Sequence, residues 1–287
     1  MISSLEIWDM AAGTARVVLQ TPRHIEAPNW SPDGKYLLVN GEGRLFRVAL
    51  DAPALLPVPM DMPKDMARGL NNDHGITPDG QTYIVSSHHQ GNGSQIYTMP
   101  ADGGDLQEIT PDAPSWWHGI SPDGQTLAYV AARGSARVID VYIKAWGQPE
   151  RRLTHGEGHC DGPDYSPDGA RIYYNCDRPI SDKAGHAQIW VMNADGSDQR
   201  QLFADAYVNW FPHPSPDGLH ILYLAYPPAT TGHPANLPVA LCLCGPNGEN
   251  PRRLVEFTGG QGSINVPCWA PDAHAFAFVR YYYPALK

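Results

Sequence analysis

The sequence predicts an all-β fold, a six-bladed β-propeller with four-stranded blades, on three observations. The tetrapeptide Ser31-Pro32-Asp33-Gly34 returns five more times, three times unchanged. Successive copies are 46, 44, 45, 49 and 55 residues apart, a period typical of propellers and solenoids. Each copy is followed by an apolar run and then by an alternating one. The later copies begin at Thr77, Ser121, Ser166, Ser215 and, in a degenerate form, Ala270.

Each copy of the tetrapeptide predicts a tight turn between two strands. Proline at the second position fixes φ near the value that a turn needs, aspartate bonds nearby backbone, and glycine accepts positive φ. The apolar, β-branched and aromatic runs that follow are typical of buried strands. These runs occupy residues 36–39, 83–85, 127–130, 172–174, 221–224 and 276–279.

The remainder of each repeat predicts two more strands. An alternating run such as residues 188–192 leads to a second turn at residues 193–196, and a short polar strand follows at residues 199–202. With the strand before the first turn, each repeat supplies the four strands of one blade.

The two ends of the chain together predict the sixth blade. Residues 5–8 and 15–19 look like the last two strands of a blade, and residues 266–269 and 276–280 look like its first two. Pairing them would close the ring and leave no exposed strand edge. We therefore expect a single β-propeller domain over residues 1–287.

The repeat strings resemble the WD-like repeats of TolB-type propellers over nearly the whole chain. The resemblance is carried by Trp-Ser-Pro-Asp-Gly at residues 30–34 and by Gln-Ile-Trp-Val-Met-Asn-Ala-Asp-Gly at residues 188–196. It implies the propeller fold. It does not select a function, because such repeats serve binding proteins, protease-associated propellers and sugar-acid lyases alike.

Composition narrows the partners and the compartment. The formal charge is −10 and no basic run is present, which argues against nucleic acid or an anionic membrane as partner. No signal peptide and no membrane-spanning stretch is recognisable, so we expect a cytoplasmic protein. The oligomeric state is left open. We expect reduced thiols at Cys160, Cys176, Cys242, Cys244 and Cys268.

Ten of the twelve histidines are expected on one rim of the ring. In a propeller, the segment before each Ser-Pro-Asp-Gly turn comes from the rim opposite to that turn and runs along the channel. Loops between second and third strands open on the same rim. The histidines before turns are His24, His74, His118, His155, His159 and His213, and those in the loops are His88, His89, His186 and His233.

Aligning the repeats on the turn yields the candidate site. Positions three and five residues before the turn share strand parity and should face the channel. Imidazoles and carboxylates converging from separate blades suit a divalent metal, which could be zinc, manganese or calcium. The predicted metal ligands are His74, His118 and Asp161, the predicted catalytic residues are His213, Asp164 and Arg178, and the predicted substrate-binding residues are Glu26, Asn29, Asn72, Asp73, Asn209, Trp117 and Asn265.

Two functions follow from this site, and both stay open at this point. The first is a metal-assisted hydrolase or lyase acting on a small polar substrate, a carbohydrate or an ester, in the channel mouth. Without a metal, a histidine oriented by Asp161 or Asp164 could act as general base. The second is a TolB-like propeller that binds a protein or ligand without catalysis. Polar channel residues can also be purely structural, and whether the loop at residues 226–238 covers the mouth is not decided.

Overall fold

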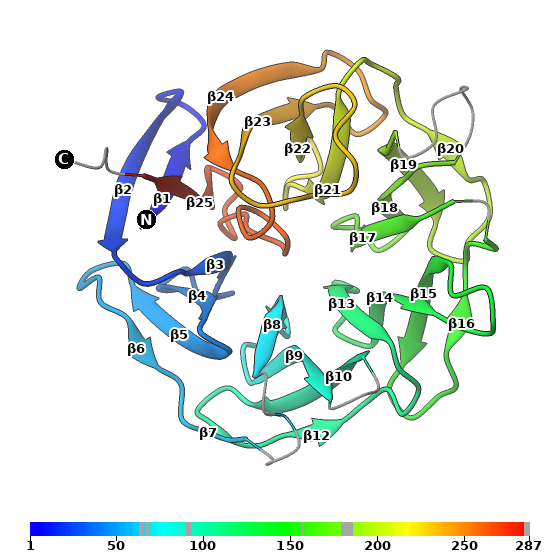
Figure 1. Cartoon of the computed structure of the whole chain (residues 1–287), viewed down its shortest axis with the longest axis horizontal. Coiled ribbons are helices and arrows are strands. Elements are labelled where there is room, and N and C mark those ends of the chain that lie inside the picture. The colour runs from blue at the N-terminus through cyan, green and yellow to red at the C-terminus, as the bar shows by residue number, and fades with distance from the viewer. Residues whose placement is uncertain (63–65, 67–68, 90–92, 157, 179–185, 284–287) are drawn as a thin grey trace.

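The computed structural model describes residues 1–62, 66, 69–89, 93–156, 158–178 and 186–283, and it is a ring of six β-sheets (Figure 1). The first blade contains β3 (Glu26–Trp30), β4 (Tyr36–Gly41), β5 (Arg44–Ala49) and β6 (Leu56–Pro57). The second contains β8 (Leu70–Ile76), β9 (Thr82–His89), β10 (Gly93–Pro100) and β12 (Gln107–Glu108). A short parallel pair, β7 (Met60–Asp61) and β11 (Gly104–Asp105), joins these two blades.

The next three blades repeat the same order from the inside of the ring to the outside. The third contains β13 (Ser115–Ile120), β14 (Thr126–Ala132), β15 (Ile139–Ala145) and β16 (Arg151–Arg152). The fourth contains β17 (Cys160–Tyr165), β18 (Arg171–Cys176), β19 (Gln188–Asn193) and β20 (Arg200–Gln201). The fifth contains β21 (Val208–Pro214), β22 (Ile221–Tyr226), β23 (Leu237–Cys244) and β24 (Arg252–Gly259).

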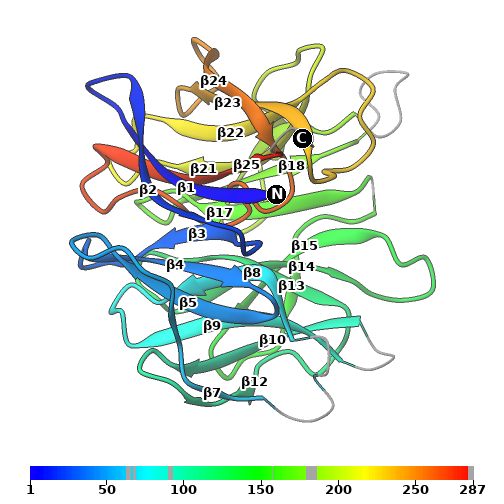
Figure 2. The same cartoon turned by 60° about the vertical axis from the view of Figure 1, so that its left-hand side comes forward.

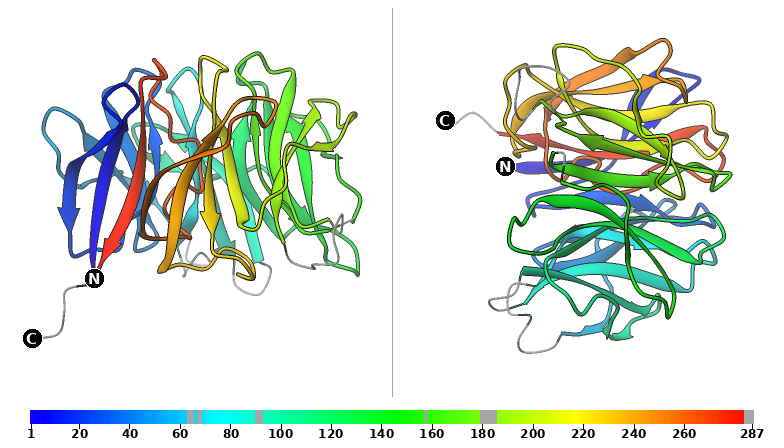
Figure 3. Two further views of the ribbon diagram at one scale, coloured as in Figure 1. Left: turned by 90° about the horizontal axis from the view of Figure 1, so that it is seen from above. Right: turned by 90° about the vertical axis from the view of Figure 1, so that its right-hand side faces the viewer.

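The sixth blade closes the ring with both ends of the chain, which confirms the prediction. β1 (Ile2–Asp9) lies between β2 (Thr14–Thr21) and β25 (Ala275–Tyr282), as the side view shows (Figure 3). β1 and β25 pair antiparallel along their whole length. The innermost strand is reduced to the bridge between Trp269 and Phe276. The preceding residues leave the sheet and turn towards the channel, where the orange-red segment lies in Figure 1.

The Ser-Pro-Asp-Gly turns are held by the same bonds in the first five repeats. In the first, Ser31 Oγ donates to Asp33 Oδ1 over 2.8 Å, and the backbone N–H of Lys35 donates to the same carboxylate over 3.1 Å. Gly34 takes a φ of 75°, in the left-handed region that glycine enters without steric cost. The equivalent hydroxyl-to-aspartate bonds occur from Thr77, Ser121, Ser166 and Ser215.

The hydrophobic core lies between neighbouring sheets, which stand face to face around the ring (Figure 2). Trp210 of the fifth blade and Trp8 and Phe276 of the sixth blade are buried in one cluster. Trp8 lies near the N-terminus and Phe276 near the C-terminus, so this cluster joins both ends of the chain. Such burial of large side chains is the main driving force for closing the ring. Within the described part of the chain, no helix is long and apolar enough to cross a membrane.

A bulge interrupts the innermost strand of each of the first five blades. The register shifts by one residue between Glu26 and Asn29 in β3 and between Asp161 and Asp164 in β17, with one-residue shifts in β13 and β21 and a two-residue shift in β8. In three of these strands the residue four positions before the turn has positive φ, namely Ala27, Gly162 and Phe211. A bulge adds one residue to the strand and re-aims the side chains beyond it. Simple alternation therefore does not hold along the channel.

Candidate functional site

A cavity of about 220 Å³ opens where the innermost strands begin. Its walls come from four blades and from three connecting segments, the β16–β17 loop, the β22–β23 loop and the β24–β25 segment. A larger hollow of about 410 Å³ lies on the rim of the Ser-Pro-Asp-Gly turns, and its described lining contains no histidine. We take the smaller cavity as the candidate site because it combines histidines with buried carboxyl groups. Its lining is Asp73, Trp116, His118, Val130, Ile139, His159, Asp161, Phe211, His233, Gln261 and Asn265.

Three imidazoles surround the Asp161 carboxylate. His118 Nε2 lies 2.9 Å from Oδ1, and His159 Nε2 lies 3.3 Å from Oδ2. His233 Nε2 lies 3.8 Å from Oδ2, which is beyond hydrogen-bond range. The backbone N–H of Gly162 also donates to Oδ1 over 2.8 Å. The Asp161 carboxylate is thus the negative group around which the three imidazoles of the cavity are arranged.

The two bonded histidines and Asp161 stabilise one another in their charged forms. Burial alone would raise the pKa of Asp161, but the bonds from His118 and His159 and their charges hold it well below its usual range. Burial would likewise lower the pKa of His118 and of His159, and the bond to Asp161 outweighs it, so both pKa values are raised. His118 Nδ1 faces the carbonyl oxygen of Asn265 at 3.4 Å. Both ring nitrogens of His118 therefore face acceptors, as an imidazolium requires.

His233 has the opposite character. Burial lowers its pKa more than the nearby Asp161 carboxylate raises it, so this imidazole is neutral near pH 7. Its Nδ1 is bonded to the side-chain oxygen of Gln261. The ring packs against Trp210 with centroids 4.4 Å apart and against Phe211 at 5.1 Å. Its side chain keeps 26% of its surface exposed and lines the cavity.

Asp73 supplies an acid group to the same cavity. It is buried, and burial raises its pKa to about 7, with the Asp161 and Glu26 carboxylates adding to the rise against the opposing charge of His118. A carboxyl group with such a pKa is partly protonated at neutral pH and can donate a proton. The cavity therefore holds two imidazoles with raised pKa values, a third whose pKa is lowered, and a protonatable carboxyl group.

The expected metal-ligand set is not formed. His74 is fully buried, its Nε2 faces the carbonyl oxygen of Leu38 at 3.4 Å, and it does not line the cavity. Burial lowers its pKa to about 4. His118 and Asp161 bond to each other instead of to a common point. Among the described residues, no group of three or more His, Cys, Asp or Glu side chains is arranged to hold a metal ion, so we derive no step through a metal.

The expected proton-transfer pair exists but is closed off. His213 Nδ1 lies 3.0 Å from Asp164 Oδ2, and its Nε2 donates to the carbonyl oxygen of Ile264 over 2.7 Å. Burial raises the pKa of Asp164 by more than the hydrogen bond and the charge of His213 lower it. Neither residue lines the cavity, because the β24–β25 segment fills the channel above them. Asn29 binds the same segment through its bond to Pro267 O over 2.6 Å. His213, Asp164 and Asn29 therefore hold the β24–β25 segment in the channel and are not placed to act on a substrate.

Three other predicted site residues lie outside the cavity. Trp117 is buried in the core, where its ring covers Gly75 of the neighbouring blade. Arg178 bonds Gln199 and stacks over Trp190 at 4.9 Å, within the fourth blade. Asn209 donates to Gln188 over 3.2 Å and to Asp205 over 3.0 Å between blades four and five. Alternation could not show that these three side chains pack within or between blades.

The remaining substrate-binding candidates do lie at the mouth. Asp73 and Asn265 line the cavity, and Asn72 connects Glu26 to Gln261 through bonds of 3.5 and 3.1 Å. Sequence reasoning missed Gln261 as a site residue, and it placed His159 and His233 on the correct rim without assigning them a role. Gln261 has no repeat equivalent, because it lies where the last repeat departs from the others. His233 shows that the β22–β23 loop contributes to the site.

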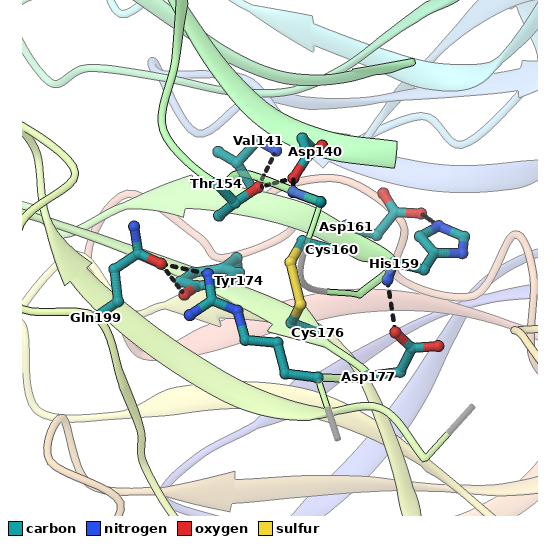
Figure 4. Close-up of a disulfide and its surroundings, with 12 residues drawn as sticks. Asp140, Val141, Thr154, His159, Cys160, Asp161, Tyr174, Cys176, Asp177 and Gln199 are labelled. Carbon is teal, nitrogen blue, oxygen red and sulfur yellow. Dashed lines mark hydrogen bonds and ion pairs between the residues drawn. A yellow bond between two sulfur atoms is a disulfide. The ribbon is translucent and has the colours of Figure 1, made fainter. Parts of the chain in front are cut away.

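A disulfide lies beside the site, which corrects the expectation of five reduced cysteines. Cys160 and Cys176 are directly opposite on β17 and β18 and are bonded, whereas Cys242, Cys244 and Cys268 are free and buried (Figure 4). Cys160 lies between His159 and Asp161, and the backbone N–H of His159 donates to Asp177 Oδ1 (Figure 4). The cross-strand bond therefore ties down the segment that carries two of the site residues.

Comparison with known proteins identifies the family. The TolB β-propeller domain model, PD40, matches residues 112–231. An uncharacterized protein of Agrobacterium fabrum is 44% identical over 283 residues, which cover 98% of this chain and 93% of that protein. A solved Agrobacterium tumefaciens structure, provisionally assigned to TolB, has a TM-score of 0.92 at 44% identity and covers 99% of both chains. The chain belongs to the TolB-type β-propeller family.

More distant structures share only the fold with this TolB-type propeller. The oligogalacturonate lyase of Vibrio parahaemolyticus is 15% identical with a TM-score of 0.54, and the alignment covers 90% of this chain and 74% of that one. The family by itself does not assign a reaction.

Proposed function

We propose that this TolB-type propeller is an acid–base enzyme, a hydrolase or lyase that acts on a small polar substrate in the channel mouth. The observation that carries the proposal is the cavity around Asp161, where His118 with a raised pKa, His233 with a lowered pKa and the Asp73 carboxyl group with a pKa of about 7 meet. Groups with such separated protonation states are typical of active sites.

Each group has a distinct task in the proposed reaction. His233 Nε2 takes a proton from the substrate in an elimination or from water in a hydrolysis. Asp73, in its protonated form, donates a proton to the leaving group. The imidazolium of His118, oriented by Asp161, stabilises negative charge that develops on the substrate. Trp116 forms one wall of the cavity, which suits a sugar ring or another flat apolar face.

The proposal can be tested without knowing the natural substrate. A panel of nitrophenyl esters, glycosides and oligogalacturonates is incubated with the wild-type protein and with a His233→Gln variant. We expect turnover of at least one class and a loss of at least about 100-fold in the variant, the usual contribution of a general base. A His186→Gln variant is the control, because this imidazole contacts Gln188 and the Asp205 carbonyl outside the cavity.

Chelation provides a second arm of the same experiment. Because the described residues offer no metal-ligand group, we expect turnover to survive dialysis against EDTA. Turnover that is abolished by EDTA and restored by zinc, manganese or calcium would overturn the metal-free mechanism. Equal turnover in wild type and His233→Gln would overturn the assignment of the base.

Binding without turnover is the second candidate, and membership of the TolB-type family favours it. In that case the same cavity would hold a polar ligand or a peptide side chain. Calorimetry on the same panel separates the two functions. Binding that depends on Asp161, with no product formed in any reaction, would support the binding module and count against the enzyme.

A further inference from the structure

We propose that Glu26, Asn72 and Gln261 form a chain of positioning residues that keeps the proton of His233 on Nδ1 and leaves Nε2 free in the cavity. The inference rests on the proposed function for its catalytic consequence. The protonated nitrogen itself can be measured without any substrate. None of the three residues needs to touch the substrate to have this effect.

The chain has a direction because it ends on a carboxylate. Glu26 can only accept hydrogen bonds, so Asn72 Nδ2 must donate to Glu26 Oε1, over 3.5 Å. This leaves Asn72 Oδ1 as the acceptor for Gln261 Nε2, over 3.1 Å. Gln261 then presents its carbonyl oxygen to His233, and this oxygen needs the N–H on Nδ1. A neutral imidazole with its proton on Nδ1 has a lone pair on Nε2.

The geometry on the other side of the ring agrees with this direction. His233 Nε2 lies 3.8 Å from Asp161 Oδ2, too far for a hydrogen bond, although a proton on Nε2 would be attracted to that carboxylate. The charged and titratable groups facing His233 are Asp161, which favours protonation, and His159 and His118, which oppose it. Trp210, in a tilted arrangement, and Phe211, in a T-shaped one, pack against the ring and restrict its rotation.

The chain connects elements that are far apart in the sequence. Glu26 belongs to β3, Asn72 to β8, Gln261 to the β24–β25 segment, and His233 to the β22–β23 loop. His24 contacts the Glu26 carboxylate at 3.1 Å and stacks on Tyr281 at 5.2 Å, which fixes the far end. The loop that carries His233 is thus locked to the opposite side of the mouth.

The test is the nitrogen NMR spectrum of ¹⁵N-histidine-labelled protein near pH 7, where the shifts of Nδ1 and Nε2 report which nitrogen carries the proton. His233→Gln identifies the signals. In the wild type we expect the Nδ1–H form of His233 to dominate. In Gln261→Leu we expect the ratio of Nδ1–H to Nε2–H forms to fall about fivefold or more, the size of one net hydrogen bond. Gln125→Leu on the opposite rim is the control, because the exposed side chain of Gln125 donates to Asp123 O within its own turn and lies outside the candidate site.

A conservative variant keeps the test decisive if Gln261→Leu does not fold. Glu26→Gln preserves the shape but replaces the acceptor-only end of the chain, so His233 should show a mixture of both forms. A wild-type His233 protonated mainly on Nε2, or unchanged signals in folded Gln261→Leu or Glu26→Gln, would overturn the inference. Absence of turnover with the predicted nitrogen signals would instead overturn only the proposed function.

Discussion

Asp73 and Asp161 line the same cavity, yet their surroundings move their pKa values in opposite directions. Burial dominates at Asp73 and raises its pKa to about 7. At Asp161 the bonds and charges of His118 and His159 outweigh burial and lower the pKa. Asp73 is therefore suited to donate a proton and Asp161 to stay ionised, a difference that composition and spacing alone cannot reveal. The sequence pointed to both aspartates, and only the structure separates them.

Replacing Asp73 by asparagine should change how stability depends on pH. A folded-state pKa raised above the ordinary 3.8 means that the folded protein holds the proton more tightly. This contribution is fully present below about pH 4 and is lost as pH rises through about 7. Relative to Asp73→Asn, the wild type should lose up to about 4 kcal/mol of unfolding free energy across this window. Urea unfolding at several pH values measures it, and a difference between the two proteins that does not vary with pH would contradict it.

At the scale of single elements, the bulged inner strands explain where prediction failed. The turn chemistry and the apolar runs located the strands well, because both are local properties of the sequence. The side-chain directions depended on strict alternation, and the extra residues at the bulges of the first five inner strands break it. His74 shows the result, since its position three residues before the turn predicted a channel-facing side chain, and it is instead fully buried with Nε2 towards the carbonyl oxygen of Leu38. Positive φ at Ala27 and Phe211 has no sequence signal comparable to glycine.

Gly75→Ala tests the packing role of Trp117. A β-carbon at Gly75 would lie 1.9 Å from Cη2 of Trp117, and the ring sits in a filled core. Overpacking of this kind typically costs about 1–3 kcal/mol of stability. We expect chemical denaturation to show such a loss for Gly75→Ala. The loss should be smaller when the same change is made in a Trp117→Leu background, and equal losses in both backgrounds would contradict the contact.

The disulfide at the start of the fourth blade should be a measurable source of stability. Cys160 and Cys176 are separated by 16 residues, and closing a loop of about this length stabilises by roughly 3 kcal/mol. Reduction of the wild type and the Cys160→Ser/Cys176→Ser variant should each lower the melting temperature. Reductant should have no further effect on the double variant. A wild-type melting temperature that does not respond to reductant would contradict a disulfide in the folded protein.

At the scale of the whole molecule, the ring closure was predictable and the plugged channel was not. Repeat spacing and the incomplete segments at both ends were sufficient for six blades and their closure, which β1 and β25 confirm. The sequence predicted residues 266–269 as the first strand of the sixth blade, but only the bridge between Trp269 and Phe276 is formed, and the residues before it turn into the channel. The contacts of this β24–β25 segment with His213 and His118 decide which predicted site residues remain accessible.

Removing residues 1–22 should abolish cooperative folding. This deletion takes away β1 and β2, exposes the edge of β25 and removes the buried side chains of Leu5, Ile7 and Trp8 from the core. Each such side chain contributes about 1.5–3 kcal/mol by burial. Calorimetry should show no sharp transition for the truncated chain, and a peptide of residues 1–22 should restore one. A truncated protein that melts at the wild-type temperature would show that closure is dispensable.

The most direct measurement of the central claim is a pH titration of the ring nitrogens of His118 and His233 in the wild-type protein, followed by ¹⁵N NMR. The claim is that these imidazoles hold different protonation states side by side. We predict that at pH 7 His118 carries protons on both nitrogens, because Asp161 raises its pKa, and that His233 is neutral, because burial lowers its pKa. A neutral His118 or a doubly protonated His233 at that pH would contradict the acid–base site.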